Sequence, residues 1–249
     1  WGGRCRLVAI TWIPTNSGLV QDVAAVGAAC RELEVPYLVD ACQAVGQIPI
    51  DVTALQCDYL SATGRKFLRG PRGIGFLYVS DHALARGAYP LMVDMRGARW
   101  VADDRFALAE GAQRFEDWEF PYALVLGQGE AARYAREVGI DTASARAWGL
   151  AARLREALGN IEGVRVLDRG ATRCAIVTMS APRGTAQELV QFLMARRINT
   201  VASLREYGRY DFAEKGVEGA VRLSPHYYNT EAEVDAAADA VAEFVADAS

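Results

Sequence analysis

The sequence is poor in lysine. Of its 249 residues 27 are basic, and only two of these are lysines, Lys66 and Lys215. An arginine stays protonated at any ordinary pH, whereas a lysine can lose its proton and become a nucleophilic amine. Lys66 lies within Thr-Gly-Arg-Lys, surrounded by arginines and apolar residues. The scarcity of other lysines therefore makes Lys66 a candidate for chemistry.

Other absences exclude whole classes of function. No apolar run reaches the roughly 18 residues typical of a membrane span, and we see no signal-peptide pattern. The formal net charge is −4 and there is no basic patch with interleaved aromatic residues, so we expect no nucleic-acid partner. The five cysteines form no CxxC pair, which leaves zinc and thioredoxin-type sites unsupported. We expect free thiols and a cytoplasmic protein.

The first half of the chain alternates short apolar runs with a helical pattern. Apolar residues recur at helical spacing over 20–34, which predicts a helix. Strand, helix and strand in this order predict a mostly parallel sheet covered by helices, with ligands at the carboxyl ends of the strands. We expect strands at 7–13, 37–39, 59–62 and 74–79.

The pattern changes near Pro121. Residues 122–138 and 142–158 read as two long helices, and shorter strands and helices follow. A threonine at 230 followed by acidic residues predicts the start of the last helix. We therefore expect two domains, 1–121 with the larger sheet and 122–249 as a smaller α+β domain. Because the chain begins at Trp1, we also expect that an N-terminal segment is missing.

Polar side chains follow three of the predicted strands. Thr15, Asp40 and the stretch 63–66 each come directly after an apolar run. Asp40 alone is equally consistent with an aspartate that opens a turn. An aspartate beside a pyridinium nitrogen, together with a lysine that forms a Schiff base, is the protein side of pyridoxal phosphate chemistry.

The motifs resemble those of the class V aminotransferase family. The resemblance is carried by Asp40-Ala-Cys-Gln43, by Thr63-Gly-Arg-Lys66 and by Gly70-Pro-Arg-Gly-Ile-Gly75, and it runs from about Leu7 to the C-terminus. It implies a fold-type I enzyme with pyridoxal 5'-phosphate as cofactor, an amino acid as substrate, and a homodimer with the active site near the interface. The family includes cysteine desulfurases, C–S lyases and isopenicillin N epimerase-like proteins.

The resemblance also implies roles for single residues. Lys66 would hold the cofactor aldehyde and then move the proton at Cα, and Asp40 would keep the pyridine nitrogen protonated. Gln43 would bind the phenolic oxygen of the cofactor. Thr63 and Arg65 would bind its phosphate, although desulfurases usually carry histidine in place of Arg65.

Two further residues complete the implied site. Thr15 aligns with a polar residue near the cofactor ring. Arg222 matches the arginine that binds the substrate α-carboxylate, a role suited to a bidentate guanidinium. On local sequence alone an ordinary strand arginine is favoured, and the family resemblance favours the binding role. His226 lies near Arg222 and could approach a substrate, whereas His82 reads as a surface turn residue.

Departures from the desulfurase pattern favour another activity. A desulfurase needs an exposed nucleophilic cysteine shortly before the substrate-binding arginine, and residues 199–220 contain none. Trp118 and Glu119 replace small residues of the family's segment that reaches the partner's phosphate, as in the branch with hercynylcysteine sulfoxide lyase. We therefore expect a C–S lyase that eliminates at Cβ of an S-substituted cysteine.

Several alternatives remain open at this point. The same residues could support an epimerase or racemase, or an aminotransferase, and cysteine desulfuration ranks last among the enzymatic readings. The non-enzymatic alternative is a cofactor-binding remnant with a regulatory role.

Overall fold

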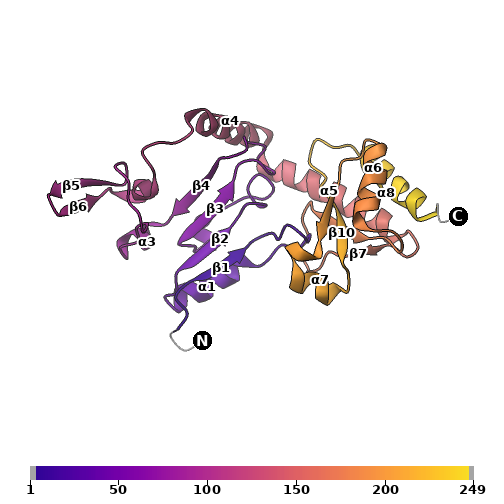
Figure 1. The fold of residues 1–249 in the computed structure, drawn as a ribbon, viewed down its shortest axis with the longest axis horizontal. Helices are drawn as coiled ribbons and strands as arrows, with labels where there is room; N and C mark the ends of the chain where they lie inside the picture. Colours follow the sequence, from indigo (N-terminus) through magenta and orange to yellow (C-terminus); the bar gives the residue numbers. More distant parts are fainter. Residues whose placement is uncertain (1–3, 247–249) are drawn as a thin grey trace. The chain divides into compact units, whose positions relative to one another are not determined.

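The structure, a computed structural model, describes residues 4–246. Within these residues the chain forms two compact units (Figure 1). The first unit contains residues 4–12 and 22–137, and the second contains 13–21 and 138–246. No helix in the described part of the chain is long and apolar enough to cross a membrane.

The first unit is built on a four-stranded sheet in the order β1-β2-β3-β4 (Figure 1). Its strands are β1 (Val8–Thr11), β2 (Tyr37–Asp40), β3 (Tyr59–Thr63) and β4 (Gly75–Val79). The first three run parallel and β4 is antiparallel to β3, which confirms the mostly parallel sheet predicted from the sequence.

Helices α1 (Val23–Glu32) and α2 (Val52–Leu55) pack against each other in this unit. Asp22 caps α1 by accepting the amide hydrogen of Ala25 at 3.0 Å. A Cβ on Gly27 would lie 2.0 Å from the carbonyl oxygen of Leu55, so only glycine permits this close approach.

The rest of the first unit includes a hairpin that the sequence analysis did not identify. The hairpin consists of β5 (Ala98–Ala102) and β6 (Arg105–Leu108). The other elements of this part are α3 (Asp81–Ala85), the 3-10 turn η1 (Gly111–Phe115) and α4 (Tyr122–Val138).

The second unit is an antiparallel sheet in the order β7-β8-β10-β9, with helices packed on it. Its core is formed by fully buried aliphatic side chains of the helices and strands, which is the expected arrangement for an α+β layer. The elements are β7 (Arg165–Val166), β8 (Val177–Ser180), β9 (Val201–Leu204), β10 (Gly219–Leu223), α5 (Ile140–Gly159), α6 (Ala186–Ala195), η2 (Arg205–Tyr207), α7 (Arg209–Lys215) and α8 (Glu231–Ala246).

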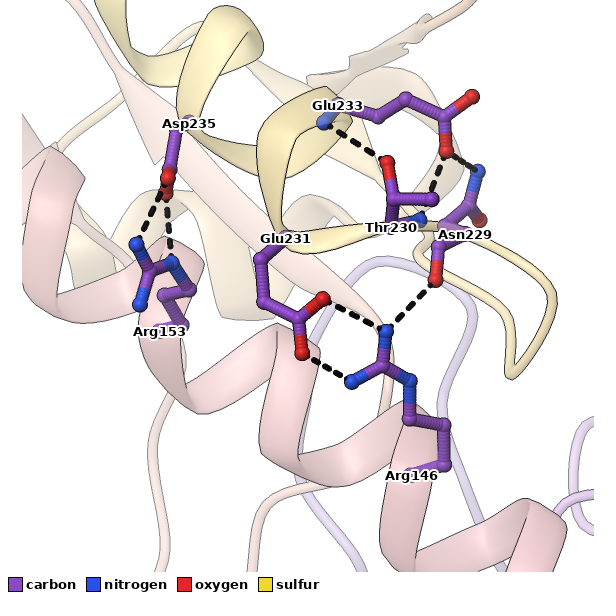
Figure 2. A network of polar contacts seen from close by, with 7 residues as sticks. All are labelled: Arg146, Arg153, Asn229, Thr230, Glu231, Glu233 and Asp235. Atoms are coloured by element: carbon purple, nitrogen blue, oxygen red, sulfur yellow. Dashed lines mark hydrogen bonds and ion pairs between the residues drawn. The ribbon is translucent and has the colours of Figure 1, made fainter.

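The start of α8 confirms the helix start predicted at residue 230 (Figure 2). The amide of Thr230 donates to the Glu233 carboxylate at 2.8 Å, and the Glu233 amide donates to the Thr230 hydroxyl at 3.2 Å. Glu231 and Asp235 also form ion pairs with Arg146 and Arg153 of α5. The hydrogen bond from Arg146 lowers the pKa of Glu231 to about 2.

The compact units do not divide at the predicted boundary between residues 121 and 122. Helix α4 belongs with the first unit, because Gln128 donates to the carbonyl of Gly75 at 3.3 Å and Gly127 lies against Pro71. The segment 13–21 lies instead with the second unit. Periodicity predicts that these residues are helical or extended, but it does not specify which core they join.

Candidate active site

Asp40 and the turn that holds Lys66 lie at the same edge of the first sheet. In the strand register Thr11 is opposite Asp40, and Asp40 is opposite Ser61. Each of the three parallel strands therefore ends at this edge. The chain leaves β3 after Thr63 and enters the turn that carries Lys66. Ligands of such sheets bind at this edge. Thr15, which the sequence analysis expected at the same edge, lies in the second unit.

Glycines bring the loops after β2 and β3 into contact. Gly46 has a φ of +83°, and a Cβ there would lie 2.4 Å from the backbone nitrogen of Leu68. The amide of Gly70 donates to the carbonyl of Gly64 at 2.7 Å, which closes the turn around Lys66. The loop that follows Asp40 is thus packed directly on the loop that follows Lys66.

The carboxylate of Asp40 is held from two sides. The backbone amide of Cys42 donates to Oδ1 at 2.9 Å, and the hydroxyl of Thr11 donates to Oδ2 at 3.4 Å. Both donors fix the orientation of the carboxylate. Neither Thr11 nor Cys42 was predicted from the sequence. Thr11 could have been found from its position at the end of the first predicted strand, next to the strand that ends at Asp40.

Cys42 lies among the predicted cofactor residues. Burial raises the pKa of its thiol, and the neighbouring Asp40 carboxylate raises it further, whereas the Thr63 backbone and the Lys66 charge oppose the change. The balance keeps the thiol protonated, so Cys42 does not offer the thiolate that a nucleophilic cysteine needs.

The other predicted cofactor residues of this unit lie on the same two loops. Gln43 is buried, and its carbonyl accepts a hydrogen bond from Gln47 at 2.8 Å. Thr63 and Lys66 are half-buried, and Arg65 is exposed. The structure therefore brings Asp40, Gln43 and residues 63–66 together on one edge of the sheet.

The second lysine has a structural position. Nζ of Lys215 is buried and donates to the Asp211 carboxylate at 2.7 Å, one helical turn earlier on α7. This pairing explains why Lys215 is present without any chemical role.

Thr15 and Arg222 belong to the second unit and contact each other there. Nη1 of Arg222 donates to the carbonyl oxygen of Thr15 at 3.3 Å. Nε of Arg222 is buried and has no hydrogen-bond partner among the described residues. Burial lowers the pKa of the Arg222 guanidinium. A buried donor without a partner is costly, and a carboxylate would satisfy it.

Both histidines are engaged locally. His226 is buried, its ring stacks on Tyr228, and its Nδ1 accepts the amide hydrogen of Tyr227 at 3.0 Å. His82 is not a simple turn residue, because it lies on α3 and its Nδ1 is 2.9 Å from the buried carboxylate of Asp58. Arg69, just after Lys66, lies over the ring of Tyr134. These contacts are structural.

Comparison with known proteins identifies the family. The model of the family described as "Aminotransferase class-V" matches residues 2–237. The chain belongs to the class V aminotransferase family. A cysteine desulfurase IscS of Salmonella schwarzengrund is 32% identical over 250 residues, covering 94% of this chain and 56% of that protein. A probable cysteine desulfurase of Methanothermobacter thermautotrophicus is 27% identical, with 92% of this chain and 58% of the relative covered.

Solved structures agree on the fold. An apo cysteine desulfurase of Thermococcus onnurineus superposes with a TM-score of 0.89 at 24% identity, over 96% of this chain and 60% of that one. The cystine C–S lyase C-DES, solved with its product cysteine persulfide, gives 0.82 at 26% identity over 96% and 61%. The chain therefore spans less than two thirds of the length of these relatives.

The comparisons confirm the predicted family, the fold-type I α/β architecture and pyridoxal phosphate as the family's cofactor. A C-DES variant was solved with glycine covalently linked to this cofactor. The residues of this chain fit it, because a doubly hydrogen-bonded carboxylate lies at the same sheet edge as the turn that carries the half-buried Lys66. Within residues 4–246 no three His, Cys, Asp or Glu side chains are grouped to hold a metal ion.

Proposed function

We propose that the protein is a pyridoxal phosphate enzyme that cleaves the C–S bond of cysteine or an S-substituted cysteine. The observation that carries the proposal is the juxtaposition of Asp40 and the Lys66 turn at one sheet edge. Cysteine desulfurases and a cystine C–S lyase among the similar proteins support this reaction class.

Each residue has a defined role in this proposal. The cofactor, when bound, would accept the electron pair that remains on Cα after its proton is removed. Asp40, oriented by Thr11 and Cys42, stabilises a proton on the ring nitrogen. Lys66 anchors the cofactor and then removes the Cα proton. Gln43, Thr63, Arg65 and Thr15 hold the cofactor, and Arg222 binds the substrate carboxylate.

Two versions of C–S cleavage differ in the fate of sulfur. A desulfurase transfers sulfur to its own thiolate, and the relatives with higher identity are desulfurases, so this version gains support that the sequence analysis did not give it. A lyase releases the sulfur with its substituent. Three cysteines favour the lyase, because Cys30, Cys57 and Cys174 are buried and burial raises the pKa of each thiol, whereas Cys5 is only partly buried.

The products distinguish the two versions. For the lyase, the Cα–H and Cβ–S bonds break, and water then converts the remainder to pyruvate and ammonia while the thiol leaves. We expect pyruvate from an S-alkyl cysteine, and no persulfide on the protein by thiol-labelling mass spectrometry after incubation with cysteine. Alanine with a protein persulfide would establish the desulfurase instead. Exchange of the Cα hydrogen with solvent without elimination would favour the epimerase, and a keto acid with retained sulfur the aminotransferase.

We also propose that the protein forms a homodimer. The β5–β6 hairpin places Trp100 and Phe106 opposite each other, and they are 74% and 50% exposed. Leu91, Met92 and Met95 nearby in the sequence are exposed as well. Apolar side chains gathered in this way are typical of an interaction surface. A second copy is the occupant that the family resemblance implies.

Charged substitutions on the hairpin test the dimer. Trp100→Asp together with Phe106→Asp is expected to convert the dimer to a monomer, because each copy would bury two unpaired carboxylates. Sedimentation velocity measures the change. Arg99→Asp in the same strand is the control, since it alters charge without removing apolar surface. A dimer that persists in the double variant would contradict this interface.

A further inference from the structure

A buried ion pair lies in the same unit as Arg222, the predicted carboxylate-binding arginine. Nε of Arg155 is 2.7 Å from Oδ2 of Asp168, and the two side chains are 9% and 0% exposed. The Nη2 group of Arg155 donates to the carbonyls of Cys174 and Ile176 at 2.6 and 2.7 Å. These contacts fix the pair within the second unit.

Asp168 uses its other oxygen to join two segments. Oδ1 accepts the amide hydrogen of Gly18 at 3.1 Å, the amide hydrogen of Thr178 at 2.9 Å and the hydroxyl of Thr178 at 2.6 Å. Gly18 lies 150 residues before Asp168 in the chain. One carboxylate thus connects the segment 13–21 with strand β8.

Both connected segments contact or neighbour Arg222. Thr178 is the residue opposite Arg222 in the pairing of β8 with β10. The segment 13–21 supplies the Thr15 carbonyl that accepts from Nη1 of Arg222. Asp168 does not itself contact Arg222 in any hydrogen bond found in the described residues, so it acts through these two neighbours.

Gly18 allows the segment to reach the pair. A Cβ at this position would lie 2.5 Å from the Ile176 carbonyl, 2.6 Å from Nη2 of Arg155 and 2.8 Å from Cγ of Asp168. The amide of Cys174 also donates to the Gly18 carbonyl at 2.8 Å. Even a methyl group must displace the segment, and with it the carbonyl of Thr15.

We propose that Asp168 is a positioning residue for Arg222, acting through Gly18 and Thr178. The ligand class concerned is the α-carboxylate of an amino acid, so the inference rests on the role of Arg222 in the proposed function. Arg222 makes few contacts of its own, since its Nε has no partner in the described part of the chain. The orientation of the Arg222 guanidinium therefore depends on the neighbouring strand β8 and on the carbonyl of Thr15.

The test uses Gly18→Ala and Thr178→Val in the protein loaded with pyridoxal phosphate. Binding of L-alanine and of ethylamine, which lacks the carboxylate, is measured by titrating the change in visible absorption. Gly18→Ala is expected to weaken L-alanine binding about tenfold and leave ethylamine binding unchanged. Thr178→Val, which keeps the backbone donor, is expected to give a smaller loss of the same kind. Cofactor affinity and the melting temperature are recorded for each variant.

Thr200→Val is the matched control. Oγ1 of Thr200 is buried in the same unit and has no hydrogen-bond partner in the described residues, so its removal should not change either ligand's affinity. Equal losses for L-alanine and ethylamine, or an unchanged preference in both variants, would overturn the positioning role. If the unsubstituted protein does not prefer L-alanine to ethylamine, the role proposed for Arg222 fails, and this inference fails with it.

Discussion

Replacing Lys66 with alanine is expected to abolish covalent cofactor binding and to lower turnover by about 10²–10⁴-fold. Alanine can neither form a Schiff base nor move a proton at Cα. The turn itself should survive, because it is closed by backbone hydrogen bonds from Gly70 to Gly64 and from Arg69 to Lys66. The visible absorption of the protein after dialysis measures the covalent cofactor, and a coupled assay measures turnover.

Two lysine-to-arginine variants separate charge from chemistry. Lys66→Arg keeps the positive charge, yet it should lose the visible absorption as completely as alanine does. Lys215→Arg should retain it, because Lys215 pairs with Asp211 on α7. Borohydride reduction followed by peptide mapping locates the linked lysine directly. Covalent cofactor in Lys66→Ala would show that a residue other than Lys66 binds the cofactor covalently.

The sheet edge was the most predictable part of the molecule. Apolar runs ended by Asp40 and by the residues before Lys66 are local signals, and parallel strands necessarily bring their carboxyl ends together. The strand register then placed Asp40 beside β3, as the sequence had indicated. Gly46, with a positive φ, and Gly64, whose carbonyl accepts the amide hydrogen of Gly70, complete the two loops.

Long-range contacts were the least predictable part. Asp168 contacts Gly18 across 150 residues, and nothing in the local pattern of either segment indicates the pair. Residues 13–21 directly follow β1, but their hydrogen bonds lie with the second unit. Helix α4 was predicted as a helix after the domain boundary, and in the structure its contacts lie with the first compact unit. Periodicity gives the apolar face of an element and leaves its partner undetermined.

The hairpin was missed for a different reason. Residues 98–108 contain several charged residues and two adjacent aspartates, so the segment lacks the apolar run that identified the other strands. Its exposed aromatic residues, Trp100 and Phe106, lie opposite each other across the two strands. Because most side chains of this hairpin are exposed, its sequence does not show the apolar alternation of a strand that packs on a core.

Replacing Arg222 with methionine is expected to raise KM for an amino-acid substrate by about 30- to 150-fold with a smaller effect on kcat, corresponding to roughly 2–3 kcal/mol. The guanidinium is partly desolvated and its Nε lacks a partner in the described residues, so a carboxylate would gain charge-assisted hydrogen bonds there. Steady-state kinetics over a wide range of substrate concentrations separates KM from kcat. Methionine keeps the apolar length of the side chain, which limits the effect on folding.

Two further substitutions test whether the effect comes from carboxylate binding at Arg222. Arg222→Lys should recover only part of the affinity, because an ammonium cannot bind a carboxylate in the bidentate geometry. Arg205→Met, which removes an exposed arginine paired with Glu218 on the same unit, should leave KM nearly unchanged, because exposed ion pairs contribute little. If Arg222→Met and Arg205→Met have equal effects, the carboxylate binds elsewhere. If only Arg222→Met raises KM, the partnerless Nε marks the position where substrate charge is recognised.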